Sequence, residues 1–326
     1  MKLRHLIYMA SAGITLGFLA GCSADEKPDA GGETARLAIS RISIGRYSAD
    51  VATRADAGGS SSMTILKEGT VGISRASGGT VADNQPFAYG ASSSWTAAAA
   101  KGILLSAATS QMAAYYPYAA NGVYSGSGSN ATLSMAACRY QAEKDLCAGT
   151  FTATADEYDP TPVLSHLYAR ISFRFVKQYT YTGAGEVKTF TLKSVTTGAT
   201  YKLFERALGN TSTTDYQLSG ITDVKANTEQ STIDLLIVPM SGIPAAGIAF
   251  RFHVDGTESK DQYRGTLPQD LFAKTGGNLQ AGSHYKLQVL LGEGGFTIQG
   301  DKSPAPGVSD WNPVALSGDY SMEVDY

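Results

Sequence analysis

The chain has 326 residues and a net charge of −3, and charged residues make up only 17% of the sequence. With 36 glycines and 18 tyrosines, the composition suits short strands joined by turns and fits neither a helical bundle nor a disordered chain. The slightly acidic balance gives no support to nucleic-acid binding.

The first 21 residues have the pattern of a bacterial secretory signal peptide of the lipoprotein type. Basic residues near the start precede an apolar stretch over 6–20, and Leu19-Ala20-Gly21-Cys22 brings small residues up to a cysteine. The apolar stretch is too short to span a bilayer as a helix, which needs ~20 residues. We therefore expect lipidation of the Cys22 thiol, the alternative being an ordinary signal peptide with a chance cysteine. Residues 22–35 are polar and turn-rich, and they predict a disordered, lipidated tether.

A first strand is predicted over 36–46, where large aliphatic residues alternate with small or polar ones. Its aliphatic members are Leu37, Ile39, Ile42 and Ile44. The alternation slips by one residue near Arg41, as a β-bulge would cause. A polar loop over 47–62 follows and contains Arg54, so a trypsin-like protease could cut it. A surface loop with one solvated arginine is the plainer interpretation, and physical reasoning alone favours it.

Period-two alternation recurs between turn signals through the rest of the chain, which is typical of a β-sandwich or barrel. The clearest predicted strands cover 167–175, 233–238, 248–254 and 285–291. Two prolines and two carboxylates within 157–162 predict an extended, solvated boundary between domains. The sequence therefore predicts an all-β chain with domains over 36–158 and 163–326, without a long helix.

The last residues of the chain alternate between an apolar and a polar face. The apolar members are Val314, Leu316, Tyr320, Met322, Val324 and Tyr326. A strand that runs to the final residue has two interpretations, because chain ends are usually frayed unless something holds them. It either packs in its own sheet or is offered to another molecule.

Residues with catalytic or ligand-binding chemistry are sparse. Outside the signal peptide, the histidines are His166, His253 and His284. No carboxylate or cysteine stands at ligand spacing from them, so we expect no metal site, no cofactor and no catalytic histidine cluster. Cys138 and Cys147 could form a local disulfide or remain two separate thiols, and the sequence does not decide between these alternatives. The tyrosines within 113–118 could stack on sugar rings, although aromatic residues on a strand are more often part of a core or an interface.

Several short motifs occur in an order and spacing that are specific only when taken together. They are Leu19-Ala20-Gly21-Cys22, Ala52-Thr53-Arg54-Ala55, Ala113-Ala114-Tyr115-Tyr116-Pro117-Tyr118, Asp145-Leu146-Cys147-Ala148, His166-Leu167-Tyr168-Ala169-Arg170-Ile171, Leu236-Ile237-Val238-Pro239, Ala281-Gly282-Ser283-His284-Tyr285 and Asp310-Trp311. With these motifs the chain resembles the fimbrillins of the Bacteroidales type V pilus, which are lipoprotein precursors of fimbrial subunits. It departs from that family at Cys147, where the family usually has a hydrophobic residue.

The resemblance implies two tandem transthyretin-like β-sandwich domains on the outer face of the outer membrane. A trypsin-like, arginine-specific protease would cut after Arg54 and leave Ala55 as the first residue, with Arg46 as the second candidate. Loss of the strand over 36–46 would then open an apolar groove. Residues 314–326 of a neighbouring copy are our candidate for the strand that fills it.

The function implied by the resemblance is that of a structural subunit, or pilin, that supports adhesion. Its partners would be copies of itself or related fimbrillins, with a host protein or glycan as a further ligand. Two alternatives stay open: a fimbrial tip adhesin of the same family, and a monomeric surface lipoprotein that binds glycan. None of the three is an enzyme.

Overall fold

The structure is a computed structural model, and it describes residues 32–45, 63–98, 102–119, 122–255, 263–293, 295–300, 312–314 and 319–323. The regular secondary structure of the described residues is almost entirely β-strand. The helical segments among them are short 3-10 turns at Gly128–Asn130, Ala142–Lys144 and Gln269–Thr275. No helix in these ranges has the length and apolar character required to cross a membrane.

An eight-stranded sheet organises the N-terminal half of the molecule. In spatial order its strands are β3 (Thr64–Ile65), β2 (Ser43–Gly45), β13 (Val163–His166), β12 (Cys147–Ala153), β8 (Ser110–Tyr116), β4 (Thr70–Ser77), β5 (Ala82–Tyr89) and β6 (Trp95–Ala97). All neighbours pair antiparallel except β2 and β13, which are parallel. A separate ribbon pairs β1 (Ala35–Arg36) with β7 (Leu104–Leu105).

Two further sheets form the C-terminal half. The first contains β19 (Tyr263–Leu267), β18 (Ile248–Val254), β15 (Val187–Lys202), β10 (Thr132–Ala136) and β9 (Tyr124–Ser125), with β16 (Ala207–Leu218) also paired to β15. The second contains β11 (Cys138–Arg139), β17 (Thr232–Ile237), β14 (Ala169–Lys177), β20 (Ser283–Gly292), β21 (Gly295–Gly300) and β23 (Asp319–Glu323), with β22 (Asn312–Val314) also paired to β20.

The two C-terminal sheets face each other across an aromatic core, which makes this half a β-sandwich. Phe173 of β14 packs against Phe190 of β15 with ring centroids 4.6 Å apart, and Phe296 of β21 packs against Phe252 of β18 at 4.9 Å. These side chains are fully or almost fully buried and come from alternate strand positions. The apolar residues of the period-two pattern therefore form the core between the two sheets.

A second apolar cluster fills the N-terminal half, and a third joins the two halves. Met112 and Ala114 of β8 lie in the N-terminal cluster, whereas Ala113 and Tyr115 on the other face of the same strand lie in the joining cluster. That joining cluster also contains Leu133 of β10 and other side chains from the C-terminal sheets. One strand thus contributes to two cores because successive side chains point to opposite faces.

The predicted strands of the C-terminal half are confirmed as β14, β17, β18 and β20. The strand predicted over 36–46 is interrupted instead: β1 and β2 occupy its two ends, and they belong to different sheets. Strand pairing also crosses the boundary predicted at 157–162, because β13 pairs with β12, and β10 pairs with β15. Hydrogen bonding between strands therefore does not follow a division into 36–158 and 163–326.

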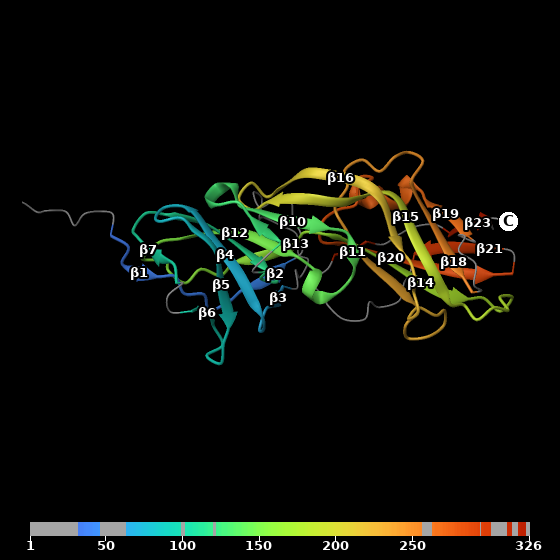
Figure 1. Ribbon diagram of the computed structural model, residues 1–326, viewed down its shortest axis with the longest axis horizontal. Helices are drawn as coiled ribbons and strands as arrows, with labels where there is room; N and C mark the ends of the chain where they lie inside the picture. The colour runs from blue at the N-terminus through green and yellow to red at the C-terminus, as the bar shows by residue number, and fades with distance from the viewer. Residues whose placement is uncertain are drawn as a thin grey trace, which may run out of the picture.

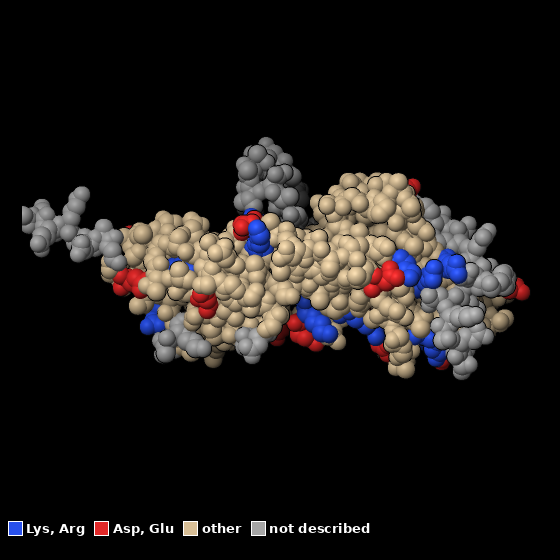
Figure 2. All heavy atoms as spheres, turned by 45° about the horizontal axis from the view of Figure 1, so that its top comes forward, with Lys and Arg blue, Asp and Glu red and all other residues tan. Residues whose placement is uncertain are grey.

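The molecule is elongated, with β1 and β7 at one end and β21 and β23 at the other (Figure 1). The visible face in Figure 2 is formed mainly by uncharged residues, and its charged side chains of both signs lie in small, scattered groups. Among the described residues visible on this face, no large patch of one charge is seen.

Candidate assembly site

Residues 32–45, called the N-terminal segment below, are hydrogen-bonded to other parts of the chain on both of their sides. At one end, the Thr34 and Leu37 amides donate to the carbonyl oxygens of Leu105 and Ile103, both at 2.8 Å. In the middle, the Ile39 carbonyl accepts from the Trp95 amide at 2.9 Å, while the neighbouring Ala38 amide donates to the Tyr158 carbonyl at 2.9 Å. At the other end, β2 lies between β3 and β13. The segment therefore fills a position within the fold and is not a strand added to an edge.

The aliphatic residues of the N-terminal segment all belong to the core of the N-terminal half. Leu37, Ile39, Ile42 and Ile44 are buried, with exposed fractions between 0% and 6%. Their cluster includes Trp95, which is 1% exposed and packs edge-on against Tyr89 at 5.3 Å. Removing the segment would therefore uncover an apolar groove with an aromatic side chain in its wall.

An ion pair fixes the start of the segment. Glu33 accepts a hydrogen bond from Arg75 at 2.7 Å and another from the Thr80 amide at 3.2 Å. The Arg75 side chain is only 2% exposed, and its guanidinium also donates to the carbonyl oxygens of Thr80 and Leu104. The hydrogen bond from Arg75 is the main reason why the pKa of Glu33 is lowered. A buried arginine on β4 thus depends on a carboxylate from the segment.

The residues predicted for lipidation and cleavage lie outside the described residues. These are Cys22, Arg46, Arg54 and Ala55. The described chain stops at Gly45, the last residue of β2, and resumes at Met63, just before β3. The predicted cleavable loop therefore connects two adjacent antiparallel strands. It is the only covalent link between the N-terminal segment and the chain that follows it.

The C-terminal residues pair with their own sheet wherever they are described. β22 runs parallel to β20, with Val314 opposite Tyr285, and β23 runs antiparallel to β21, with Tyr320 opposite Ile298 and Met322 opposite Phe296. Leu316, Val324 and Tyr326 lie outside the described residues. The sequence allowed the C-terminal strand either to pack in its own sheet or to be offered to another molecule. The described strands pack in their own sheet. Donation to another molecule stays a prediction. β23 is the last strand of that sheet, at the end of the molecule opposite β1 (Figure 1).

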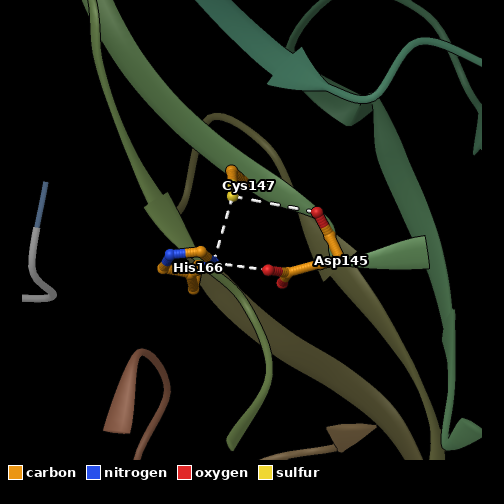
Figure 3. A group of neighbouring side chains, drawn as sticks. All are labelled: Asp145, Cys147 and His166. Carbon is orange, nitrogen blue, oxygen red and sulfur yellow. Dashed lines mark hydrogen bonds and ion pairs between the residues drawn. The ribbon is translucent and has the colours of Figure 1, made fainter. Parts of the chain in front are cut away.

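Cys138 on β11 and Cys147 on β12 are both free cysteines and do not form a disulfide. Cys147 instead stands directly opposite His166 in the pairing of β12 with β13. Its Sγ lies 3.3 Å from the Nδ1 atom of His166, and the same Nδ1 lies 2.9 Å from Oδ2 of Asp145 (Figure 3). The sequence, with no cysteine or carboxylate at ligand spacing from a histidine, did not predict this spatial group. Local spacing could not reveal this group, because β-pairing joins residues 19 apart in sequence.

The tyrosine group predicted for sugar stacking is partly internal. Tyr115 is fully buried, donates to Oδ1 of Asn84 at 2.7 Å, and stacks on Tyr124 with ring centroids 6.1 Å apart. Burial raises the pKa of Tyr115. This ring belongs to the joining cluster and is not available for a sugar.

Comparison with known proteins gives a family model and several similar folds. The model of fimbrillin-like proteins matches residues 52–311. A proposed cell adhesion protein from Bacteroides uniformis has a similar structure, with a TM-score of 0.56 and 17% identity over 82% of this chain and 97% of that chain. Another from Bacteroides ovatus has a TM-score of 0.51 and 14% identity over 90% of this chain and all of that chain.

Identities this low show similarity of fold and nothing finer. No curated protein matches the chain. The family model, in contrast, covers most of the sequence, from the predicted cleavable loop to the residues just before β22. The chain belongs to the fimbrillin-like family.

Proposed function

We propose that this chain is a structural subunit of a surface fimbria, made as a lipoprotein precursor, cut by an arginine-specific protease and polymerised by strand exchange. The supporting observation is the N-terminal segment, which is hydrogen-bonded on both sides and has its aliphatic residues in the core. In this proposal the segment occupies the groove of the precursor until cleavage after Arg54, or after Arg46, separates it from the rest of the chain. Membership of the fimbrillin-like family supports the fimbrial and adhesive part of the role.

The segment is stable in place but replaceable. Full burial of a large aliphatic side chain contributes about 1.5–3 kcal/mol, so its four aliphatic residues together contribute ~6–12 kcal/mol. Once the loop is cut, the segment is no longer covalently held and its loss becomes concentration-dependent. A segment that dissociates leaves unpaired strand edges and an apolar groove, which are the features that an added strand recognises.

The C-terminal strand is our candidate for the donor. Six large apolar residues on one face would contribute roughly 9–18 kcal/mol if all became buried. Donation requires these residues to leave β20 and β21, and ordering about a dozen released residues then costs a similar amount at ~1–2 kcal/mol each. Backbone hydrogen bonds, at about 1 kcal/mol net each, then favour exchange. The N-terminal segment and β23 lie toward opposite ends of the molecule, and a head-to-tail contact that does not close produces a filament.

The alternating C-terminal strand favours a shaft subunit over a tip adhesin, since a tip subunit has no need to donate a strand. The buried Tyr115 weakens the case for a monomeric glycan-binding lipoprotein. In this proposal the acylated precursor resides in the outer membrane and the processed subunit resides in the fimbria.

Limited proteolysis of purified precursor tests the proposal. Trypsin should give one product that begins at Ala55, and ladders should then appear on gels run without boiling. Arg54→Gln should remove the product that begins at Ala55, and the double variant with Arg46→Gln should block both cleavage and ladders. Arg46→Gln alone is the matched control and should leave the Ala55 product intact. If the ladders form equally well from uncut Arg54→Gln protein, proteolytic activation is wrong.

A second variant tests the donor separately. Deletion of 314–326 should leave a cleavable, folded monomer that cannot extend a polymer. Circular dichroism and urea unfolding serve as the folding control. Normal polymerisation of this variant would contradict the donor assignment without affecting the cleavage step.

A further inference from the structure

A buried group of three ligand-type side chains lies where β12 meets β13, and the proposed function does not use it. It consists of Asp145, Cys147 and His166, whose ligand atoms all lie within 4.8 Å of one another (Figure 3). Cys147 and His166 are cross-strand partners, while Asp145 precedes β12 by two residues. We propose that this group binds a divalent transition-metal ion and that Zn²⁺ suits its donors best.

The donor set has the chemistry of a zinc site. Thiolate sulfur, imidazole nitrogen and carboxylate oxygen are the three protein donors that Zn²⁺ takes, at about 2.3, 2.0–2.1 and 2.0–2.2 Å. In a tetrahedral site those lengths separate neighbouring donors by about 3.3–3.6 Å. Here Nδ1 of His166 lies 3.3 Å from Sγ of Cys147 and 2.9 Å from Oδ2 of Asp145. For these two pairs an ion therefore requires a separation only a few tenths of an ångström larger, while Sγ of Cys147 and the carboxylate of Asp145 lie within 4.8 Å of each other. A water or carbonyl oxygen would complete the coordination.

The same geometry argues against a cysteine–histidine nucleophile. In such a triad one ring nitrogen faces the nucleophile and the other faces the carboxylate, so that the imidazole can relay a proton between them. Here a single nitrogen, Nδ1, faces both the sulfur of Cys147 and the carboxylate of Asp145. Three donors that converge on one point are the arrangement required by a metal ion.

Burial and charge support the same assignment. All three residues are at most 6% exposed, and the second carboxylate oxygen of Asp145, Oδ1, is buried without a hydrogen-bond partner. A buried polar atom that lacks such a partner is costly, and a metal ion bound to this carboxylate would reduce that cost. One thiolate, one carboxylate and a divalent cation sum to zero charge. Binding releases the thiol proton to solvent, and the neutral imidazole that ligates through Nδ1 carries its proton on Nε2.

The site would also strengthen one wall of the groove that holds the N-terminal segment. Ser165, which precedes His166 on β13, pairs with Gly45 of β2. A metal bound to Cys147 and His166 would cross-link β12 to β13 beside that pairing. The metal site does not depend on proteolysis or polymerisation, so its test is independent of theirs.

Metal binding can be measured on the mature chain, residues 22–326, with Cys22→Ser so that only two cysteines remain. After incubation with ZnCl₂ and dialysis, we expect one equivalent of zinc by elemental analysis. With CoCl₂ we expect thiolate-to-cobalt charge-transfer absorption in the near ultraviolet and intense tetrahedral bands in the visible. Zinc should also raise the unfolding temperature, with a shift that increases with the logarithm of zinc concentration.

Variants assign the signal to the cluster. Cys147→Ser and His166→Gln should weaken zinc binding at least about tenfold, the loss that even outer-shell changes produce, and Cys147→Ser should abolish the charge-transfer band. Cys138→Ser is the matched control and should retain stoichiometry, spectrum and thermal shift. Folded wild-type protein without the cobalt–thiolate band would overturn the proposal, even if a variant failed to fold. Equal zinc binding by folded Cys147→Ser protein would overturn it as well.

Discussion

At the residue scale, His284 makes the stability of the C-terminal half depend on pH. Its Nε2 atom lies 2.6 Å from Oγ of Ser172, and that hydroxyl donates to Asp234 at 2.9 Å. Burial first, and then the positive charge of Arg170, lower the pKa of His284 to about 3. In the unfolded chain a histidine titrates near pH 6.5. Between these two values the unfolded state therefore binds a proton that the folded state excludes.

The consequence is that the free energy of unfolding falls as the pH drops from about 6.5 toward 3. The slope contributed by one such group approaches roughly 1.4 kcal/mol per pH unit. We expect His284→Gln to flatten the dependence in this window while changing stability at pH 7 far less. Urea unfolding of both proteins at pH 7, 5 and 4 measures the difference. An unchanged slope in the variant would show that other groups dominate.

The ion pair between Glu33 and Arg75 stabilises the first residues of the N-terminal segment in their hydrogen-bonded position. Glu33→Gln keeps the shape but removes the charge that balances the buried guanidinium, so the first residues of the segment should open more often. We expect faster hydrogen exchange at the amides of Thr34 and Leu37, which donate to β7 and to its neighbouring residue. The Ser43 amide, at the other end of the segment, is the internal control and should exchange at the wild-type rate. Uniform acceleration at all three positions would instead indicate global destabilisation.

At the element scale, the difference between the predicted and observed strands follows from which contacts are local. Alternation located β14, β18 and β20, because one face of each packs into the sandwich core, and a continuous apolar run located β17. Alternation also marked the buried residues of the N-terminal segment. It could not show that Arg41 lies between two short strands in different sheets, because partner choice depends on residues more than a hundred positions away, as in the pairing of β2 with β13.

The candidate sites divide in the same way. The importance of residues 36–46 was visible in the sequence, since four large aliphatic residues within eight positions must be buried somewhere. The partners of that segment were not visible, and neither was the group around His166. Its ligand atoms come from neighbouring strands whose register no local rule fixes. The sequence therefore indicated which residues are buried but not which of them contact each other in the folded chain.

Because the N-terminal segment is excised in the proposed pathway, its side chains should matter before cleavage and not afterwards. Ile42→Ala removes a fully buried side chain and should lower the free energy of unfolding of the precursor by about 2–5 kcal/mol. Ile73→Ala, on β4 in the same cluster, is the matched control with an equally buried isoleucine. After cleavage and polymerisation, Ile42→Ala ladders should dissociate at the wild-type temperature. Ile73→Ala ladders should dissociate at a lower one.

This comparison separates excision from simple nicking. If the cut segment stays in its groove, Ile42→Ala should weaken the polymer as much as Ile73→Ala does. Mass spectrometry of washed ladders gives an independent reading, because peptides from the N-terminal segment should be absent. Their retention at one copy per subunit would contradict strand exchange at this position.

At the scale of the whole molecule, donation requires β23 to leave β21, and a reversible cross-link can prevent this. Thr297 of β21 and Ser321 of β23 are opposite each other in the antiparallel register. The Cα separation of such pairs, about 4.5–5.5 Å, suits a disulfide. The double variant Thr297→Cys with Ser321→Cys should therefore form an intramolecular disulfide under oxidising conditions. Each single variant, oxidised in the same way, is the control.

Oxidised protein should be cleaved normally yet fail to donate, and reduction should restore ladders. Because the acceptor groove lies in the other half of the chain, a locked subunit should still accept a strand from an unlocked copy. Small amounts of locked protein mixed with wild type should therefore shorten the polymers, as expected when a subunit with one functional end joins a head-to-tail filament. Ladders of normal length from fully cross-linked protein would show that the C-terminal strand is not the donor. Complete loss of incorporation would show that the same strand is also needed for acceptance.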